Sequence, residues 1–278
     1  MLKTRSLFIL FVLITVVISG CSKFRKIQKS DDWKLKYEAA IKYYEKKDYY
    51  RASVLFDEIM PIVRGSEESE MIQYYYAYCH FHQGDYILSA HYFKTFYETF
   101  SRSTYAQEAN YMYAYSLYMQ SPDANLDQTS TRQAIESMQI FINRYPSSTY
   151  REEASRLINE MQVKLETKAY ENTKLFFNLK AYRKEEYLKA AMIAFENFQK
   201  DFPDSKFNEE IAYYQIEAQY LLAEESVLSK KRERYNQTIE FYLSFVDGFP
   251  ESKWLKEAEP LYEKSLKALG KIKEENNL

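Results

Sequence analysis

The 278-residue sequence has few of the residues that make tight turns, with only 5 Gly and 6 Pro. β-Sandwiches and Rossmann-type folds need many more turn residues, so the composition argues against both. Two Cys and three His leave little for a disulfide framework or a metal site. The formal net charge of −2 lacks the basic excess of most nucleic-acid-binding proteins, so we expect no nucleic-acid partner.

Catalytic motifs are missing as well. The five glycines are scattered along the chain, so there is no Gly-rich phosphate-binding loop. His80 and His82 lie two residues apart, which separates them by about 200° around a helix and prevents them from sharing a metal. Cys79 and His80 are adjacent and diverge, so they do not form a nucleophile–base pair. We predict that the protein is not an enzyme and that it uses no cofactor and no metal.

The first 20 residues are typical of a signal peptide. A short basic start precedes a largely apolar run over residues 7–18, which is shorter than the roughly 20 residues of a membrane-spanning helix. The run ends in Ile-Ser-Gly-Cys at 18–21, and this resembles the lipobox of bacterial lipoproteins. The resemblance implies cleavage before Cys21 and attachment of acyl chains such as palmitate to it. The alternative is an ordinary secretory signal followed by a chance cysteine.

Aromatic residues are abundant, with 28 Tyr, 18 Phe and 2 Trp, and many of them recur at an interval of 37 residues. Within each repeat the apolar spacing is helical, and an Asp or Gly-Asp turn separates two helices. This resembles the tetratricopeptide (TPR) repeat, in which a small residue lets the two helices of a hairpin pack closely. The recurring sets are Tyr37/Tyr74/Tyr111, Ala40/Ala77/Ala114, Ile41/Tyr78/Tyr115 and Tyr44/Phe81/Tyr118.

A second motif marks the joins between later hairpins: an aromatic residue, Pro or Ser, any residue, Ser, any residue, an aromatic residue, then Glu three positions on. Pro ends the preceding helix, Ser is expected to cap the next one, and Glu suits the positive end of its dipole. The motif predicts where each hairpin ends. It occurs four times, at Phe100–Glu108, Tyr145–Glu153, Phe202–Glu210 and Phe249–Glu257.

These patterns predict an all-α fold, an α-solenoid of about five TPR-like helical hairpins plus a C-terminal capping helix. Residues 148–179 contain no Gly or Pro and could form one long helix or two joined ones. The hairpins are expected at about 32–63, 68–100, 104–145, 165–202 and 206–249, with a closing helix at about 253–274. The predicted organisation is a signal peptide at 1–20, a lipid-anchored polar tether at 21–31, repeats 1–3 at 32–147, and at 148–278 a linking helix, repeats 4–5 and the closing helix.

The aromatic stripe predicts a binding groove. In the TPR pattern the first helix of each hairpin lines the concave face, and Tyr offers contact area there while keeping a hydroxyl in water. The alternative is that the same side chains pack between hairpins, although such a core would favour Leu. The groove candidates are Tyr37, Ile41, Tyr44, Tyr74, Tyr78, Phe81, Tyr111, Tyr115 and Tyr118.

A basic run lies near the last hairpin, at Lys230, Lys231, Arg232 and Arg234, and we expect it between the two helices of that hairpin. Most charge runs are solvated helix faces, and the alternative is a docking contact for an acidic partner domain. Trp254, at the start of the closing helix, is a further candidate for docking.

The lipobox, about 250 mature residues, the hairpins, the joins and a C-terminal helix together resemble the BamD family, lipoproteins of the outer-membrane β-barrel assembly machinery. The resemblance implies an outer-membrane protein that is anchored by lipid and faces the periplasm. It implies that the protein binds unfolded outer-membrane proteins through its N-terminal repeats. It also implies docking on a BamA-type barrel protein, together with other subunits of the machinery, through the C-terminal repeats. Phe241 stands where an ungapped alignment places an Arg of the family's BamA contact, so that contact is not carried over.

Two other functions fit parts of this pattern. A SusD-like glycan-capture lipoprotein is also built from TPR units, but it carries a large non-repeat region for which this chain has no room. A periplasmic TPR scaffold serving the envelope or cell-wall machinery is the second alternative.

Overall fold

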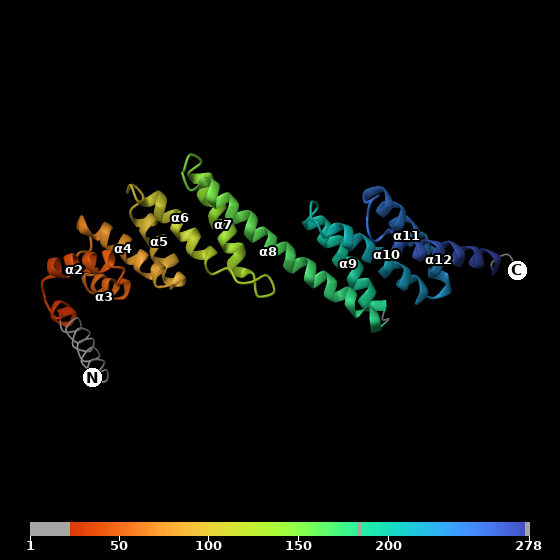
Figure 1. The fold of residues 1–278 in the computed structure, drawn as a ribbon, viewed down its shortest axis with the longest axis horizontal. Helices are drawn as coiled ribbons and strands as arrows, with labels where there is room; N and C mark the ends of the chain where they lie inside the picture. The colour runs from red at the N-terminus through yellow and green to blue at the C-terminus, as the bar shows by residue number, and fades with distance from the viewer. Residues whose placement is uncertain (1–22, 183–184, 276–278) are drawn as a thin grey trace, which may run out of the picture. The chain divides into compact units, whose positions relative to one another are not determined.

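The computed structural model describes residues 23–182 and 185–275 (Figure 1). Within these residues the chain forms helices and turns and contains no strand. The signal peptide and Cys21 lie outside the described residues. No helix of the described part combines the length and the apolar character that crossing a membrane requires.

The helices follow one another in pairs, each packed on the next, so the predicted all-α solenoid of about five hairpins with a C-terminal helix is confirmed. The pairs are α2 with α3, α4 with α5, α6 with α7, the second half of α8 with α9, and α10 with α11. The bounds are α2 Trp33–Glu45, α3 Tyr49–Ile59, α4 Glu68–His82, α5 Tyr86–Thr99, α6 Ala106–Tyr118, α7 Thr129–Arg144, α8 Arg151–Asn178, the 3₁₀ turn η1 Leu179–Tyr182, α9 Glu185–Asp201, α10 Asn208–Glu224, α11 Leu228–Gly248 and α12 Leu255–Glu275.

Helix α8 is a single helix of 28 residues, which decides between the two possibilities that its sequence left open. Its first part packs into the same cluster as α6 and α7 through Leu157 and Met161. Its second part packs with α9 and α10 through Tyr170 and Phe177. Two separate hydrophobic surfaces on one helix explain why it belongs to two compact regions.

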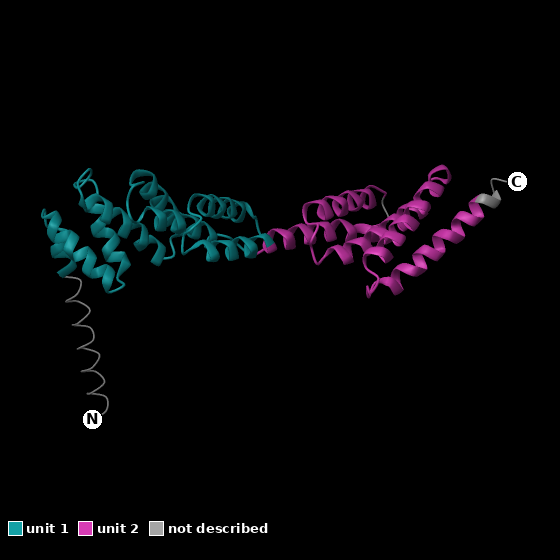
Figure 2. Ribbon diagram, turned by 90° about the horizontal axis from the view of Figure 1, so that it is seen from above, with its two compact units in different colours: residues 1–122, 126–162 teal, residues 123–125, 163–278 magenta. Residues whose placement is uncertain are grey.

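The chain divides into two compact units (Figure 2). Unit 1 comprises residues 1–122 and 126–162, and unit 2 comprises residues 123–125 and 163–278. The division therefore falls inside α8, later than the predicted boundary after residue 147, because the first part of α8 completes the core of repeat 3.

Unit 1 has two hydrophobic clusters at its centre. One lies between α2, α3 and α4, and the other extends from α4 to the first part of α8. Ala40, Ala77 and Ala114, the small residues of the 37-residue repeat, are each fully buried, as close helix packing requires. Cys79 is also fully buried and free, and burial raises the pKa of its thiol to about 12.

The turns inside the first two hairpins use the same geometry. Gly84 has φ +78°, a left-handed conformation that glycine adopts without strain, and Lys47 occupies the equivalent position 37 residues earlier with φ +61°. The Asp after each of them caps the second helix: Asp48 Oδ1 accepts from Arg51 N at 3.3 Å, and Asp85 Oδ1 accepts from Leu88 N at 3.4 Å.

The N-terminal segment departs from the predicted polar tether. Residues 23–28 are helical, and Phe24 and Ile27 pack against the cluster of the first hairpin. The Phe24 ring lies 5.7 Å from that of Tyr43, and Gln28 Nε2 donates to Glu58 Oε1 at 2.9 Å. Two apolar residues among lysines are enough to hold this turn on the hairpin, so the tether is shorter than expected.

The join serines do not cap helices as expected. Each serine Oγ accepts a hydrogen bond from the backbone N–H two residues later, before the helix begins: from Tyr105 at 3.0 Å, Tyr150 at 3.2 Å, Phe207 at 3.1 Å and Trp254 at 3.1 Å. Three of them also donate to a Glu on an earlier helix, Ser103 to Glu70 of α4, Ser205 to Glu166 of α8 and Ser252 to Glu209 of α10. The join serine thus ties two repeats together.

Candidate peptide-binding surface

The nine candidate groove residues lie on α2, α4 and α6, the first helices of the three hairpins in unit 1. Their burial divides them into two groups. Tyr74 and Tyr111 are buried, with 8% and 4% of their surface exposed. The other seven, Tyr37, Ile41, Tyr44, Tyr78, Phe81, Tyr115 and Tyr118, are half-buried and present part of each side chain to solvent.

The two buried tyrosines belong to the packing between repeats. The Tyr74 ring lies 4.7 Å from Tyr105 and 5.5 Å from Phe96. The Tyr111 ring stacks on Tyr150 at 4.4 Å, with 12° between the planes. Tyr74 and Tyr111 therefore offer little area to a ligand, and the surface available for binding consists of the seven half-buried residues.

Unit 2 repeats the same aromatic contact. Tyr170 on α8 stacks on Phe207 at 4.0 Å, and Tyr213 on α10 stacks on Trp254 at 4.8 Å. In all four cases the partner ring is the second aromatic residue of a join motif. The join motif predicted the helix boundaries but not this pairing, although its second aromatic residue recurs in all four joins.

The half-buried aromatic residues form a continuous row from α4 to α6. The Phe81 ring lies 5.7 Å from Tyr115, and Tyr115 lies 5.7 Å from Tyr118. On the α2 side, Tyr44 makes an edge-to-face contact with Tyr75 at 4.8 Å. Such rows bury apolar area against a ligand while their polar edges stay hydrated.

Two tyrosine hydroxyls on this surface donate to glutamates that lie two helices further along the chain. Tyr78 Oη donates to Glu108 on α6, and Tyr118 Oη donates to Glu160 Oε1 on α8 at 2.7 Å. Burial and the Glu108 hydrogen bond raise the pKa of Tyr78, and the hydrogen bond to Glu160, with burial, raises the pKa of Tyr118 to about 12. Tyr78 and Tyr118 therefore stay uncharged at neutral pH, and the Glu108 and Glu160 carboxylates lie beside them.

A hollow of about 420 Å³ opens between α2 and α4 at the start of this row. It is large enough for one or two side chains of a peptide, and both polar and apolar groups line it. Its lining includes two of the predicted groove residues, Tyr37 and Ile41, together with Glu38, Lys42, Glu45, Met71 and Tyr75.

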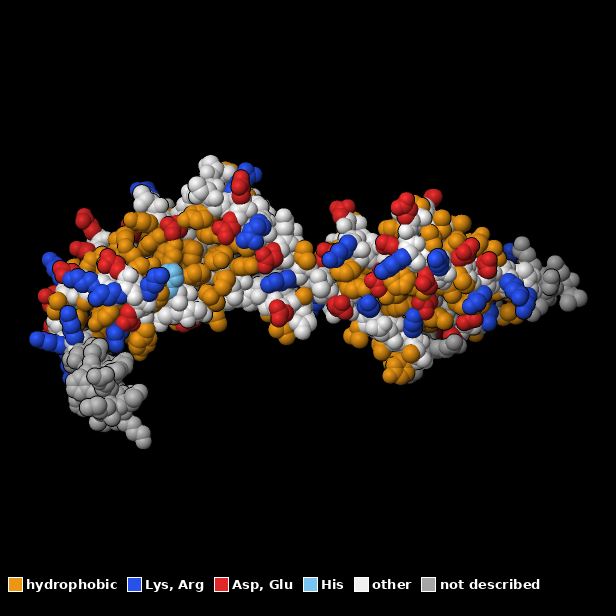
Figure 3. Space-filling view, in the orientation of Figure 1, with side chains coloured by type: hydrophobic (Ala, Val, Ile, Leu, Met, Phe, Trp, Pro, Cys, Tyr) orange, Lys and Arg blue, Asp and Glu red, His pale blue; other side chains and the backbone are white. Residues whose placement is uncertain are grey.

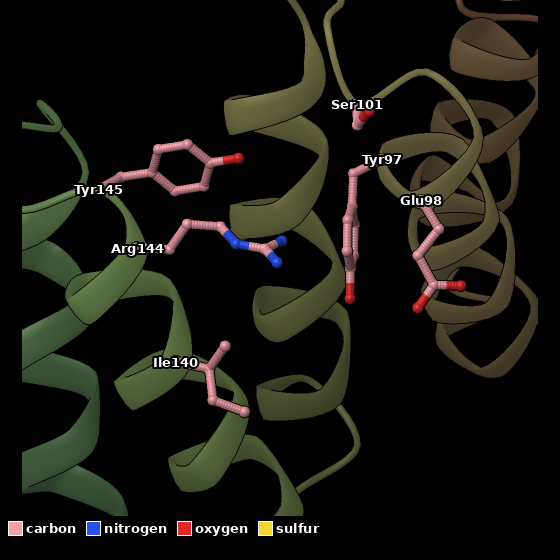
Figure 4. Close-up of a pocket in the computed structure, with 6 residues that line it drawn as sticks. All are labelled: Tyr97, Glu98, Ser101, Ile140, Arg144 and Tyr145. Carbon is pink, nitrogen blue, oxygen red and sulfur yellow. The ribbon is translucent and has the colours of Figure 1, made fainter.

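A second cavity, of about 440 Å³, lies on different helices and was not predicted (Figure 4). In Figure 4 the Arg144 side chain of α7 extends toward Tyr97 of α5, and its guanidinium carbon lies 5.9 Å from the centroid of that ring. The repeat pattern contained no signal for this cavity because its residues do not recur at the 37-residue interval. Its lining is Tyr97, Glu98, Ser101, Ile140, Arg144 and Tyr145.

The basic run lies within the first turns of α11, not in the loop where we expected it. The helical spacing continues through the run, so its cations sit at the unfavourable end of the helix dipole. Lys230 and Arg232 are exposed, and Lys231 is half-buried.

Arg234 is held inside unit 2. Its side chain is 11% exposed, its Nη2 donates to Glu185 Oε1 at 2.9 Å, and its Nη1 donates to Leu222 O at 3.3 Å and to Ser226 Oγ. Hydrogen bonds from Lys189 and Arg234 lower the pKa of Glu185 to about 2. Arg234 thus ties α11 to α9 and α10, which leaves Lys230, Lys231 and Arg232 as the cations of the run that can meet a partner.

Trp254 is half-buried at the start of the closing helix. One face of its ring is covered by Tyr213, and Lys253 Nζ lies 4.9 Å from the ring centroid. In the described part of the chain, no group of three or more His, Cys, Asp or Glu side chains could hold a metal ion.

The helical hairpins, their TPR-like turns and their repeated joins define the class of the protein as a helical-repeat solenoid. A family model described as YfiO, outer membrane lipoprotein, matches residues 29–181. The chain therefore belongs to this family, the BamD family of outer-membrane lipoproteins. The match covers the hairpins of unit 1, all of α8 and nearly all of η1. No curated protein matches the chain.

Proposed function

We propose that this outer-membrane lipoprotein binds unfolded outer-membrane β-barrel proteins and docks on a BamA-type partner to promote their folding and insertion. It is anchored through acylated Cys21 and faces the periplasm. The observation that carries the proposal is the row of half-buried aromatic residues on α4 and α6 in a chain that belongs to the BamD family. A periplasmic position fits the signal peptide and lipobox at residues 1–21.

The substrate site is the aromatic row with the adjoining hollow between α2 and α4. An extended peptide laid across the first helices would meet Tyr37 and Ile41, then Phe81, Tyr115 and Tyr118. Aromatic side chains are common at the ends of outer-membrane strands and would suit this surface. The Glu108 and Glu160 carboxylates beside the row would disfavour acidic segments.

The partner site is on unit 2. Its candidates are Lys230, Lys231, Arg232 and Trp254, since Arg234 is engaged within the unit. An acidic surface on the partner would complement these cations.

Site-specific photocrosslinking tests the substrate site. A photoreactive phenylalanine at Phe81 or Tyr115 should crosslink to an unfolded outer-membrane barrel polypeptide. The matched control is Ile87, an apolar residue of α5 that is 71% exposed and lies outside the row. Equal crosslinking from Ile87 would move the substrate site away from the first helices.

A further inference from the structure

The N-terminal end of unit 1 is basic in a chain whose formal net charge is −2. Residues 23–51 contain ten Lys and Arg but only five Asp and Glu. Figure 3 shows Lys and Arg side chains gathered over the end of unit 1 that holds α2 and α3. Positive charge is thus concentrated in the turn and the first hairpin that follow the predicted lipidation site.

Three lysines of this region converge on one hollow. Because Phe24 and Ile27 hold residues 23–28 against the first hairpin, Lys23 is brought beside Lys42 and Lys46 of α2 and its C-cap. The hollow has a volume of about 150 Å³ and no acidic residue lines it. Its lining is Lys23, Ile27, Ala39, Lys42, Tyr43 and Lys46.

The charges of this hollow are poorly compensated. Lys42 Nζ lies 3.8 Å from Glu38, but both side chains are about 70% exposed, so the pair contributes little. By contrast, Lys36 on the same helix bonds Glu58 at 2.6 Å and is nearly buried. Among the described residues no ion pair involves Lys23 or Lys46. Three lysine side chains line one hollow, so their positive charges make it favourable for an anion.

The chain itself indicates which anion lies close by. Lys23 follows Cys21 by two residues, so their Cα atoms are at most about 7–8 Å apart. If Cys21 carries acyl chains, the lipid headgroups of the membrane that holds them lie within reach of a lysine side chain. Lysines with apolar neighbours such as Ile27 and Tyr43 suit this interfacial layer, because their stems pack on apolar surface while their ammonium groups reach phosphates.

We propose that the hollow formed by Lys23, Lys42 and Lys46 binds the phosphate of an anionic lipid headgroup and is a second contact with the membrane, beside the acyl anchor. This contact fixes the first hairpin against the lipid surface. The proposal rests on the membrane anchoring in the proposed function, but its test uses an unacylated chain, so it can fail while lipidation holds.

Vesicle flotation with the chain from residue 22 onward provides the test. All clusters of both units are formed by residues 24 and later, so this chain retains its core. It should float with phosphatidylcholine vesicles that contain phosphatidylglycerol, not with pure phosphatidylcholine, and high salt should release it. Each lysine near an anionic surface contributes about a fivefold gain in partitioning, so the K23Q/K42Q/K46Q variant should partition about 100-fold less.

The matched control is K200Q/K256Q/K267Q, which removes three exposed lysines from unit 2 and changes net charge equally. It should bind as the unsubstituted chain does, and both variants should keep their helical circular dichroism and melting temperature. Equal binding by K23Q/K42Q/K46Q, an equal loss in the control, or equal flotation with neutral vesicles would each overturn the proposal.

Discussion

Unit 1 and unit 2 are built from the same hairpins but are held together differently. Unit 1 has two large hydrophobic clusters and is tied mainly by stacked tyrosines and by tyrosine hydroxyls that donate to carboxylates, with the ion pair Lys36–Glu58 joining α2 and α3. Unit 2 has three smaller clusters, and charged pairs cross between its helices, such as Lys180–Glu217 at 2.5 Å and Arg234–Glu185 at 2.9 Å. The stacking of a first-helix tyrosine on a join aromatic is common to both.

The difference shows which contacts the solenoid requires and which can vary. The join contact recurs in both units because it sets how one hairpin follows another. The other contacts between helices differ in kind: apolar packing contributes more in unit 1, and ion pairs contribute more in unit 2. Either kind can hold two helices at the same spacing. The family match covers unit 1 and α8 and ends at residue 181, before the ion-paired helices α9–α11.

The sharpest way to separate the units is to delete residues 206–278. This removes α10, α11 and α12, which hold the docking candidates Lys230, Lys231 and Arg232, together with the Trp254 that precedes α12. Co-purification with the BamA-type partner should be abolished, while unit 1 stays folded because its clusters use no residue beyond Met161. Affinity capture and circular dichroism of the shortened chain measure the two effects. Full-yield capture would place the docking site before residue 206, outside α10–α12.

The next largest effect should come from the shared join contact. Tyr111→Ala in unit 1 and Tyr170→Ala in unit 2 each remove a ring that is 4% exposed and stacked, and each should cost about 3–5 kcal/mol of unfolding free energy. Tyr118→Ala, at the edge of the row, should cost less while lowering crosslinking to substrate. Chemical denaturation of the three variants checks this. If Tyr111→Ala lowered the free energy of unfolding only slightly, Tyr111 would belong to the binding surface and not to the interior.

The pH dependence of stability should distinguish the units, because the ion pairs of Glu185 with Lys189 and Arg234 lie in unit 2. The folded pKa of Glu185, about 2, is below the unfolded value of about 4.3, so its ion pairs stabilise the fold above the unfolded value and are lost as pH falls toward 2. Glu185→Gln should therefore lower the melting temperature of unit 2 at pH 7 and lower it much less at pH 2, where about half of the folded Glu185 is protonated. A decrease of the same size at both pH values would indicate a loss of packing rather than of charge.

The smallest effect concerns the turns of unit 1. Lys47→Gly should stabilise the protein by up to about 1–2 kcal/mol, because the left-handed φ of +61° strains a side chain there and not a glycine. Gly84→Ala should destabilise the equivalent turn by a similar amount, although the added methyl group meets no atom within 4 Å. Thermal melts of both variants measure this. The two variants should change the melting temperature in opposite directions. A change in the same direction would contradict an explanation by backbone strain.

Much of the fold was predictable because its signals are local. The helical apolar spacing, the Asp and Gly-Asp turns and the join motifs each act within a few residues, so hairpin positions follow from them. The binding surface was less predictable because tyrosine suits both an interior and a wet surface. Tyr74 and Tyr78 share a helix and a repeat, yet only Tyr74 meets a join aromatic and is buried.

By itself the sequence determined the all-α class, the order of the hairpins and the position of the joins, since helix periodicity and turn chemistry are properties of short segments. Only the tertiary structure decided which tyrosines are interior and where α8 divides the chain. It also showed that Arg234 joins α11 to α9 and α10 within unit 2. Likewise, only the structure showed that Phe24 and Ile27 pack a lysine-rich turn against the first hairpin. Each of these depends on contacts between residues distant in sequence, which no local pattern encodes.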